Sequence, residues 1–236
     1  MENIKEKSLK SIVLEHHEYI PVLEKYSLDF CCRGGKTLNE ACIEKGIVID
    51  DLLIELDNSI AKSNPSMPFA EMTAEQLISY IQIHHHFYVR NAIPTIQNHI
   101  EKLVLKHGAK YPYMIEVKAL FKKVAEELLP HLEKEEQVLF PRIKTISSSD
   151  IQKDKTAIKD GYIDTPVHEL EIEHEKAGDL LYAIRTLTNN YTAPETACTT
   201  HRICLEELKA FEEDLHQHVH LENNQLFPMA QKASIN

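Results

Sequence analysis

Apolar side chains recur every three or four positions along most of this 236-residue chain, which is the spacing of one face of an α-helix. The pattern predicts long helices at about 73–105, 113–143, 166–188 and 197–232, with a kink at Pro94. The second and fourth stretches carry the inward-facing seam of a helix bundle, which runs through Val117, Phe121, Val124, Leu128, His131, Glu135 and Val138, and through Cys204, Leu208, Phe211, Leu215, His218 and Glu222. The sequence therefore predicts an all-α protein built on a four-helix bundle.

Shorter helical patterns precede the bundle, at about 9–26, 37–45 and 51–61. Thr37 followed by Glu40 is typical of a capping box at the start of the second of these helices. A proline-containing stretch then interrupts the helical pattern. We therefore expect a small helical N-terminal domain over 1–62, a linker over 63–72 and the bundle over 73–236, with a long crossover loop at 147–161.

The second and fourth long stretches share a repeated motif. One copy reads HLEKEEQVLFP (131–141) and the other HVHLENNQLFP (218–228), so that both match His-x-x-x-Glu-x-x-x-Leu-Phe-Pro. His218 follows His131 by 87 residues, and His174 follows His86 by 88 residues. The chain therefore resembles two tandem helix pairs, each with one histidine on its first helix and a His-x-x-x-Glu pair on its second.

These spacings point to a metal site. Residues four apart lie on one face of a helix, so His131 and Glu135 point the same way, as do His218 and Glu222. A single His-x-x-x-Glu pair is usually an exposed ion pair, but two glutamates on two buried seams are costly without cations. Two metal ions bridged by the glutamates, with two histidines each, remove that cost, and this donor set suits iron or manganese.

Histidines outside this set have simpler interpretations. We expect core or surface positions for His84, His85, His99, His107, His168, His201, His216 and His220. His85 is the best substitute for His86 as a ligand, because the two are adjacent in a run of three histidines. His107 and His220 are candidates for hydrogen bonds that orient the ligands.

Charge and cysteine content narrow the class of protein. The formal net charge of −11 disfavours nucleic acid and anionic lipid as partners. No apolar run approaches a membrane span, and the first 13 residues lack the apolar core of a signal peptide, so we expect a cytoplasmic protein. Five irregularly spaced cysteines are not a secreted disulfide framework.

One cysteine pair has a functional interpretation. Cys31 and Cys32 lie in a polar turn beside Arg33 and Lys36, and positive charge lowers a thiol pKa and increases its reactivity. The alternative for this pair is two inert, buried thiols. We interpret Cys31 and Cys32 as functional, and the three others as structural, namely Cys42, Cys198 and Cys204.

Taken together, the motifs resemble the bacterial iron–sulfur cluster repair di-iron proteins, also called repair of iron centres (RIC) proteins. The resemblance covers nearly the whole chain, in order, and rests on DFCCRGGKTL (29–38), HLEKEEQVLFP (131–141), EHEKAGDLL (173–181), TNNY (188–191) and HVHLENNQLFP (218–228). Its glycines fall one place later than in the family's usual Cys-Cys-Gly-Gly turn, because Arg33 intervenes.

The resemblance implies a hemerythrin-like bundle with a small N-terminal domain that carries the cysteine pair. It places the metal ligands of a di-iron centre, open to an oxo bridge, at His86, His131, Glu135, His174, His218 and Glu222, with both glutamates bridging. It also implies repair of iron–sulfur clusters damaged by nitric oxide or oxidants, by donation of iron, and it suggests a homodimer. The partners would be damaged iron–sulfur proteins.

Besides iron donation, three other functions stay open. The chain could be a nitric oxide or dioxygen binding module like true hemerythrins, an enzyme such as a ferritin-like oxidase or nitric oxide reductase, or a metal-free helical scaffold. The duplicated His-x-x-x-Glu motif weighs against an oxygen carrier, and the buried glutamates weigh against a metal-free scaffold. If the chain is an iron donor, replacing Cys31 and Cys32 by serine should harm repair. If it is a gas-binding module, the same replacement should leave gas binding unaffected.

Overall fold

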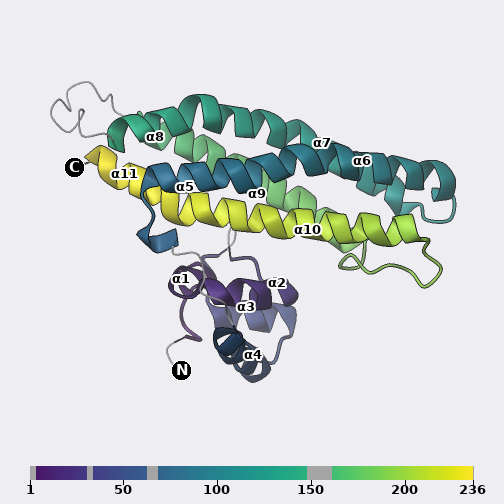
Figure 1. The fold of residues 1–236 in the computed structure, drawn as a ribbon. Helices are drawn as coiled ribbons and strands as arrows, with labels where there is room; N and C mark the ends of the chain where they lie inside the picture. The colour runs from purple at the N-terminus through teal and green to yellow at the C-terminus, as the bar shows by residue number, and fades with distance from the viewer. Residues whose placement is uncertain (1–3, 31–33, 63–68, 148–160, 236) are drawn as a thin grey trace.

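A computed structural model describes residues 4–30, 34–62, 69–147 and 161–235, and the regular elements within these ranges are helices (Figure 1). Four long rods form the bundle. Their bounds are α5 (Ala74–Ile81), η3 (Gln82–His86) and α6 (Phe87–His107) in the first rod, α7 (Tyr113–Lys134), η4 (Glu135–Leu139) and α8 (Phe140–Ser147) in the second, α9 (Asp164–Leu187) in the third, and α10 (Thr199–Leu221), η7 (Glu222–Leu226) and α11 (Phe227–Ile235) in the fourth. The expected all-α bundle is confirmed.

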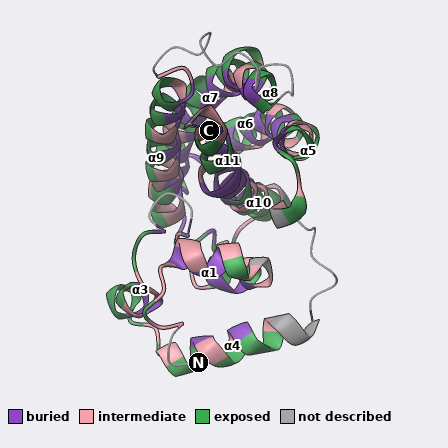
Figure 2. Ribbon diagram, turned by 90° about the vertical axis from the view of Figure 1, so that its left-hand side faces the viewer, coloured by how far each residue is buried: buried purple, intermediate pink, exposed green. Residues whose placement is uncertain are grey.

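The rods pack side by side along their length. α7 lies against both α6 and α9, and α10 lies against α6 and α9. Their buried faces point toward a shared interior (Figure 2). None of the described helices combines the length and apolar character that a membrane crossing requires.

Local sequence signals explain where several of these helices begin and end. Thr73 caps the first rod, since its hydroxyl accepts from the backbone N–H of Gln76 while the Gln76 side chain accepts from that of Thr73. The turn between α9 and α10 places Asn189, Asn190 and Tyr191 at positive φ. Because such backbone disfavours residues other than glycine, side-chain contacts must hold the turn.

Those contacts come from a buried polar cluster. The Tyr191 hydroxyl donates to Glu212 Oε2 (2.8 Å) and Arg185 Nε donates to the same oxygen (2.7 Å). Burial and the negative charge of Glu212 raise the pKa of Tyr191, so its hydroxyl stays protonated as a donor. The Glu212 carboxylate therefore ties the α9–α10 turn to the middle of α10.

Three rods depart from the expected uninterrupted α-helices. η3, η4 and η7 are π-helical, with hydrogen bonds to the residue five positions back. The expected kink at Pro94 is not where the first rod changes, because Pro94 lies inside α6 and the change falls at Gln82–His86. Val138, predicted to face inward, is 39% exposed, whereas Leu139 is fully buried.

The N-terminal part consists of α1 (Leu9–Glu15), η1 (His17–Tyr19), α2 (Ile20–Lys25), α3 (Leu38–Lys45) and α4 (Ile49–Lys62). The single helix expected over 9–26 is broken, since α1 ends at Glu15 and α2 begins with a proline in its first turn. The capping box of Thr37 and Glu40 is present at the start of α3. A 3₁₀ turn, η2 (Phe69–Glu71), precedes the bundle.

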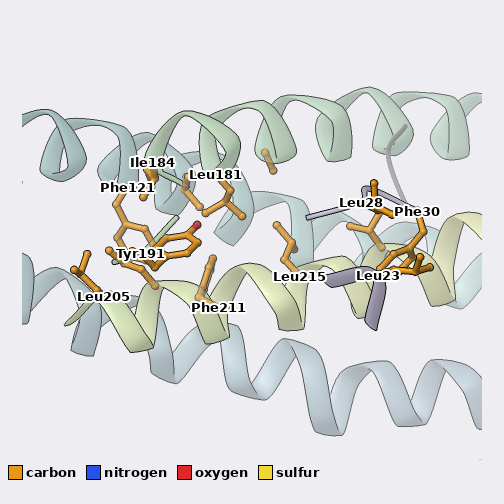
Figure 3. Packing of buried hydrophobic residues seen from close by; sticks show 14 of the residues in the cluster. Leu23, Leu28, Phe30, Phe121, Leu181, Ile184, Tyr191, Leu205, Phe211 and Leu215 are labelled. Carbon is orange, nitrogen blue, oxygen red and sulfur yellow. The ribbon is translucent and has the colours of Figure 1, made fainter. Parts of the chain in front are cut away.

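This part docks on the bundle through α10 and shares one hydrophobic cluster with it (Figure 3). Phe30 is fully buried and meets the rings of His216 and His220 edge-on, with centroids 6.2 and 5.7 Å away. His216 Nδ1 donates to Glu24 Oε1 (2.7 Å) across the same contact. Burial opposes the charge on His216, yet the neighbouring Glu24 raises its pKa to about 9. An ion pair therefore joins the two parts.

The bundle interior holds two separate apolar clusters. One contains Val89, Leu132, Ala177 and Leu215, and the other contains residues such as Ile81, Leu139, Leu170 and Leu226. Between them along each rod lies a layer of buried histidine and glutamate side chains. The two apolar clusters therefore enclose a polar centre on both sides.

The Glu212 cluster yields a stability prediction. Glu212→Ala leaves the Arg185 charge and the Tyr191 hydroxyl buried without their acceptor, so the free energy of unfolding should fall by roughly 3 to 5 kcal/mol. Chemical denaturation measures the change. Glu213→Ala is the control, because it removes only a surface pair with Lys209 and should cost less than about 1 kcal/mol. Equal losses would contradict this account of the turn.

Candidate metal centre

Six side chains converge in the polar layer, and they are the six that the sequence singled out. His86 ends η3, Glu135 begins η4 and Glu222 begins η7, while the remaining histidines lie on α7, α9 and α10. These residues are His86, His131, Glu135, His174, His218 and Glu222, and none is more than 3% exposed. Each rod therefore contributes at least one of them.

The six form two overlapping groups. One consists of His86, Glu135, His218 and Glu222, and the other of His131, Glu135, His174 and Glu222. Within each group the candidate ligand atoms lie within 4.8 Å of one another. Two histidines and two carboxylates suit a first-row transition metal such as iron. Because both glutamates belong to both groups, they are placed between two candidate ion positions.

The oxygen positions of the glutamates divide between the groups. Glu135 Oε2 lies 3.3 Å from His86 Nε2, while its Oε1 lies 3.2 Å from His131 Nε2. Glu222 repeats the arrangement, with Oε1 3.1 Å from His218 Nε2 and Oε2 3.2 Å from His174 Nε2. Each carboxylate thus turns one oxygen toward each group, which is the geometry a bridging carboxylate needs.

The hydrogen-bonding state of these atoms supports a bound cation. Among the described residues, both oxygens of Glu135, both oxygens of Glu222, and the Nε2 atoms of His86 and His218 are buried without a hydrogen-bond partner. Leaving so many polar atoms unsatisfied in the interior would cost several kcal/mol. The residues present therefore fit a metal centre.

Three of the four histidines are oriented from outside the centre. His86 Nδ1 donates to Glu136 Oε1 (2.7 Å), and His131 Nδ1 donates to Glu173 Oε2 (2.9 Å). A third bond runs from His174 Nδ1 to Asn223 Oδ1 (2.9 Å). A proton on Nδ1 leaves the lone pair of Nε2 facing the centre.

These acceptors are not the residues expected from the sequence, which were His107 and His220. The His220 ring nitrogen bonds Asn224, and His107 contacts the Tyr111 ring. A usable signal was present, since Glu136, Glu173 and Asn223 each adjoin a candidate ligand in the chain.

Charge within the centre is strongly coupled. Burial opposes ionisation of Glu135, but the neighbouring His131 and His86 hold the pKa of its carboxyl well below its usual range. Burial likewise opposes the charge on His131, yet Glu135 raises its pKa to about 9. The pKa of His218 is lowered because burial outweighs the attraction of Glu222. In the metal-free protein, protons on histidines therefore balance the two carboxylates.

The remaining predicted residues take other places. His85 is buried beside His86 but its Nδ1 donates to Asp214 Oδ1 (3.0 Å), and its ring stacks parallel to that of His218. Cys31 and Cys32 lie outside the described residues. Cys42 and Cys204 are buried free thiols, as expected for structural cysteines, and burial raises the pKa of Cys204 to about 12.

Fold and site together define a helical-bundle protein with a buried centre for cations. Residues 67–230 match the family described as the hemerythrin HHE cation binding domain, and the chain belongs to that family. Residues 5–59 match ScdA_N, which is described as a domain of unknown function.

Similar proteins cover nearly the whole chain. The chain is 32% identical to the iron-sulfur cluster repair protein YtfE of Yersinia pseudotuberculosis, over 94% of this chain and 96% of that protein. It is 30% identical to the iron-sulfur cluster repair protein ScdA of Staphylococcus epidermidis, over 94% and 97% respectively. The ScdA of Staphylococcus haemolyticus is 29% identical over 92% and 96%.

The coupled charges predict how the metal-free protein responds to pH. A histidine can have a higher pKa in the folded protein than its value of about 6.5 in the unfolded chain. Such a histidine contributes its full stabilisation below about pH 6.5, and this contribution is lost as the pH rises through the folded-state pKa. With the pKa of His131 at about 9, the metal-stripped protein should lose stability between about pH 6.5 and 9. Thermal unfolding in a chelator measures it. His131→Asn should flatten part of this dependence, and an unchanged slope would contradict the assignment.

Proposed function

We propose that this chain is a di-iron protein that repairs iron–sulfur clusters damaged by nitrosative or oxidative stress, and that it does so by donating iron. The observation that carries the proposal is the pair of buried His₂Glu₂ groups that share both glutamates. Relatives at about 30% identity are named iron-sulfur cluster repair proteins, which supports it. Iron bound there would supply exchangeable metal and open coordination positions.

In this proposal each residue has a defined role. His86 and His218 would hold one iron, His131 and His174 would hold the other, and Glu135 and Glu222, which belong to both groups, would be shared between them. The acceptors of the Nδ1 protons fix the ring orientations. The imidazoles and carboxylates would take up protons when they give up iron, because metal and proton compete for the same atoms.

We also propose that Cys31 and Cys32 assist the transfer. Phe30, which directly precedes Cys31, is buried against His220, and His220 lies on α10 between His218 and Glu222. The last described residue before the cysteine pair therefore packs against the ligand-bearing helix. Thiolates are good acceptors for iron, which supports a role for the pair in passing metal to a client.

The organisation of the chain fits separate roles in metal binding and metal transfer. We propose a domain over residues 1–62 that carries the cysteine pair, a linker over 63–72 and the metal-binding bundle over 73–236, placed in the cytoplasm. The separate family matches at 5–59 and 67–230 support the division. The clients would be damaged iron–sulfur proteins.

A second candidate function is binding or reduction of nitric oxide or dioxygen at the same centre. A narrow recess between α7 and α9 supports it, because the recess reaches His131 and His174 and is otherwise lined partly by Leu128, Ala177 and Leu215. Glu127 and Glu173 also line the recess, and its apolar side chains suit a small apolar gas.

Iron transfer distinguishes the two functions. The iron-loaded protein, mixed anaerobically with an apo iron–sulfur acceptor and a sulfide source, should rebuild the acceptor's cluster, as followed by its visible absorbance. Cys31→Ser with Cys32→Ser should slow the transfer while leaving the iron content of the protein unchanged. Cys198→Ser is the matched control, because Cys198 lies at the N-terminal end of α10, makes no capping hydrogen bond with its side chain, and should have no effect on transfer.

Two outcomes would count against the proposal. Iron retained through the incubation, together with reversible nitric oxide or dioxygen binding, would support the second function instead. Equal iron transfer by the wild type and the double cysteine variant would show that Cys31 and Cys32 do not assist the transfer.

A further inference from the structure

The Leu-Phe-Pro tails of the two repeated motifs have no part in the function proposed so far. Both tails occupy the same structural position. η4 begins at Glu135 and ends at Leu139, and η7 begins at Glu222 and ends at Leu226. In each copy the phenylalanine then begins the next α-helix, α8 or α11. The tail therefore marks the point where a π-helical segment returns to α-helix.

The backbone shows how the tail acts. The N–H of Phe140 donates to the carbonyl of Glu135, and the N–H of Phe227 donates to that of Glu222, which is five residues back in both cases. The next residue is Pro141 or Pro228, which has no N–H to donate. In an uninterrupted α-helix the proline ring would also clash with the carbonyl four residues back, which belongs to Gln137 or Asn224. The wider turn of a π segment relieves this clash, so the proline favours a π segment at this place.

A π turn contains one residue more than an α-helical turn, and this changes which side chains face the interior. A step of three from Glu135 leads to Val138, which is 39% exposed, and a step of four leads to Leu139. Leu139 and Phe140 are buried instead, at 0% and 1% exposure. Glu135 and Phe140 can therefore both face inward.

The two inward-turned phenylalanines contact equivalent histidines. The Phe140 ring lies against the His86 ring, with centroids 5.6 Å apart and planes inclined by 21°. The Phe227 ring lies against the His174 ring, with centroids 6.1 Å apart and planes inclined by 3°. Both distances are within the range of favourable ring contacts.

The second residue of each π segment acts on the same histidine. Glu136 accepts from His86 Nδ1, and Asn223 accepts from His174 Nδ1. Each segment thus supplies a bridging glutamate, an acceptor for the first histidine of its own repeat, and a ring against that histidine. The same three features recur in both copies of the motif, which indicates that the two π segments have the same role at the metal centre.

We infer that Glu-x-x-x-Leu-Phe-Pro is a positioning element, in which Pro141 and Pro228 stabilise the π segments that orient His86 and His174 for the metal. The inference rests on the ligand set proposed above. The prolines are not among the candidate metal ligands and act through Phe140, Phe227 and the segment's second residue. Replacing a proline should therefore disturb metal binding without damaging the fold.

Cobalt(II) alone, added anaerobically to the metal-free full-length chain, is the probe. We expect two ions per chain in the wild type. Pro141→Ala and Pro228→Ala should each weaken the binding of one ion by about tenfold or more and change its ligand-field absorption spectrum. Because alanine restores a helical donor, the unfolding midpoint of the metal-free variants should stay equal or rise. A purely structural role would lower stability and affinity together.

Matched controls separate this effect from general changes in the helices. Pro94→Ala alters a proline inside α6, away from any tail, and should leave affinity and spectrum unchanged. Phe140→Leu should change the spectrum, whereas Phe121→Leu, in the other apolar cluster, should not.

The outcomes are distinct. Two ions bound by every proline variant with wild-type affinity and spectrum would overturn the inference and leave the ligand set standing. The same shift in Pro94→Ala would also overturn it. A wild-type chain that binds no cobalt would overturn the ligand set and this inference with it.

Discussion

Two carboxylates buried side by side determine the organisation of this bundle. Glu135 and Glu222 are fully buried, and none of their four oxygens has a hydrogen-bond partner among the described residues. Such groups are tolerated only where positive charge compensates them. Four histidines surround them, and two apolar clusters exclude water on either side. Metal ions meet this requirement best, since each carboxylate already turns one oxygen toward each candidate position.

The centre follows the duplication of the chain but is not symmetric in its surroundings. His86 and His131 donate to carboxylates, whereas His174 donates to the Asn223 amide and His218 Nδ1 has no described partner. A carboxylate acceptor makes an imidazole a stronger donor to a metal than an amide does. Each candidate ion position has one histidine that donates to a carboxylate, so the two positions differ in their second histidine, which is His174 with an amide acceptor or His218 without a described Nδ1 partner.

The sequence predicted the four rods and the convergence of six residues because helical spacing and the duplicated motif encode them directly. It did not predict the π segments, since steps of three and four carried the seam through Val138, which the structure exposes. It also could not show that Phe30 and Glu24 dock the N-terminal helices on α10. That contact depends on residues about 190 positions apart, as His216 and Glu24 are. Periodicity describes one helix at a time and carries no information about such pairs.

The bridging role of the glutamates is tested most directly by iron stoichiometry and magnetic coupling in one sample. Protein purified anaerobically, loaded with iron and oxidised should contain two irons per chain whose spins are coupled, as Mössbauer spectroscopy in an applied field would show. Glu135→Ala and Glu222→Ala should each lose the coupling and bind less iron. One iron per chain, or two irons with independent spins in the wild type, would contradict the account.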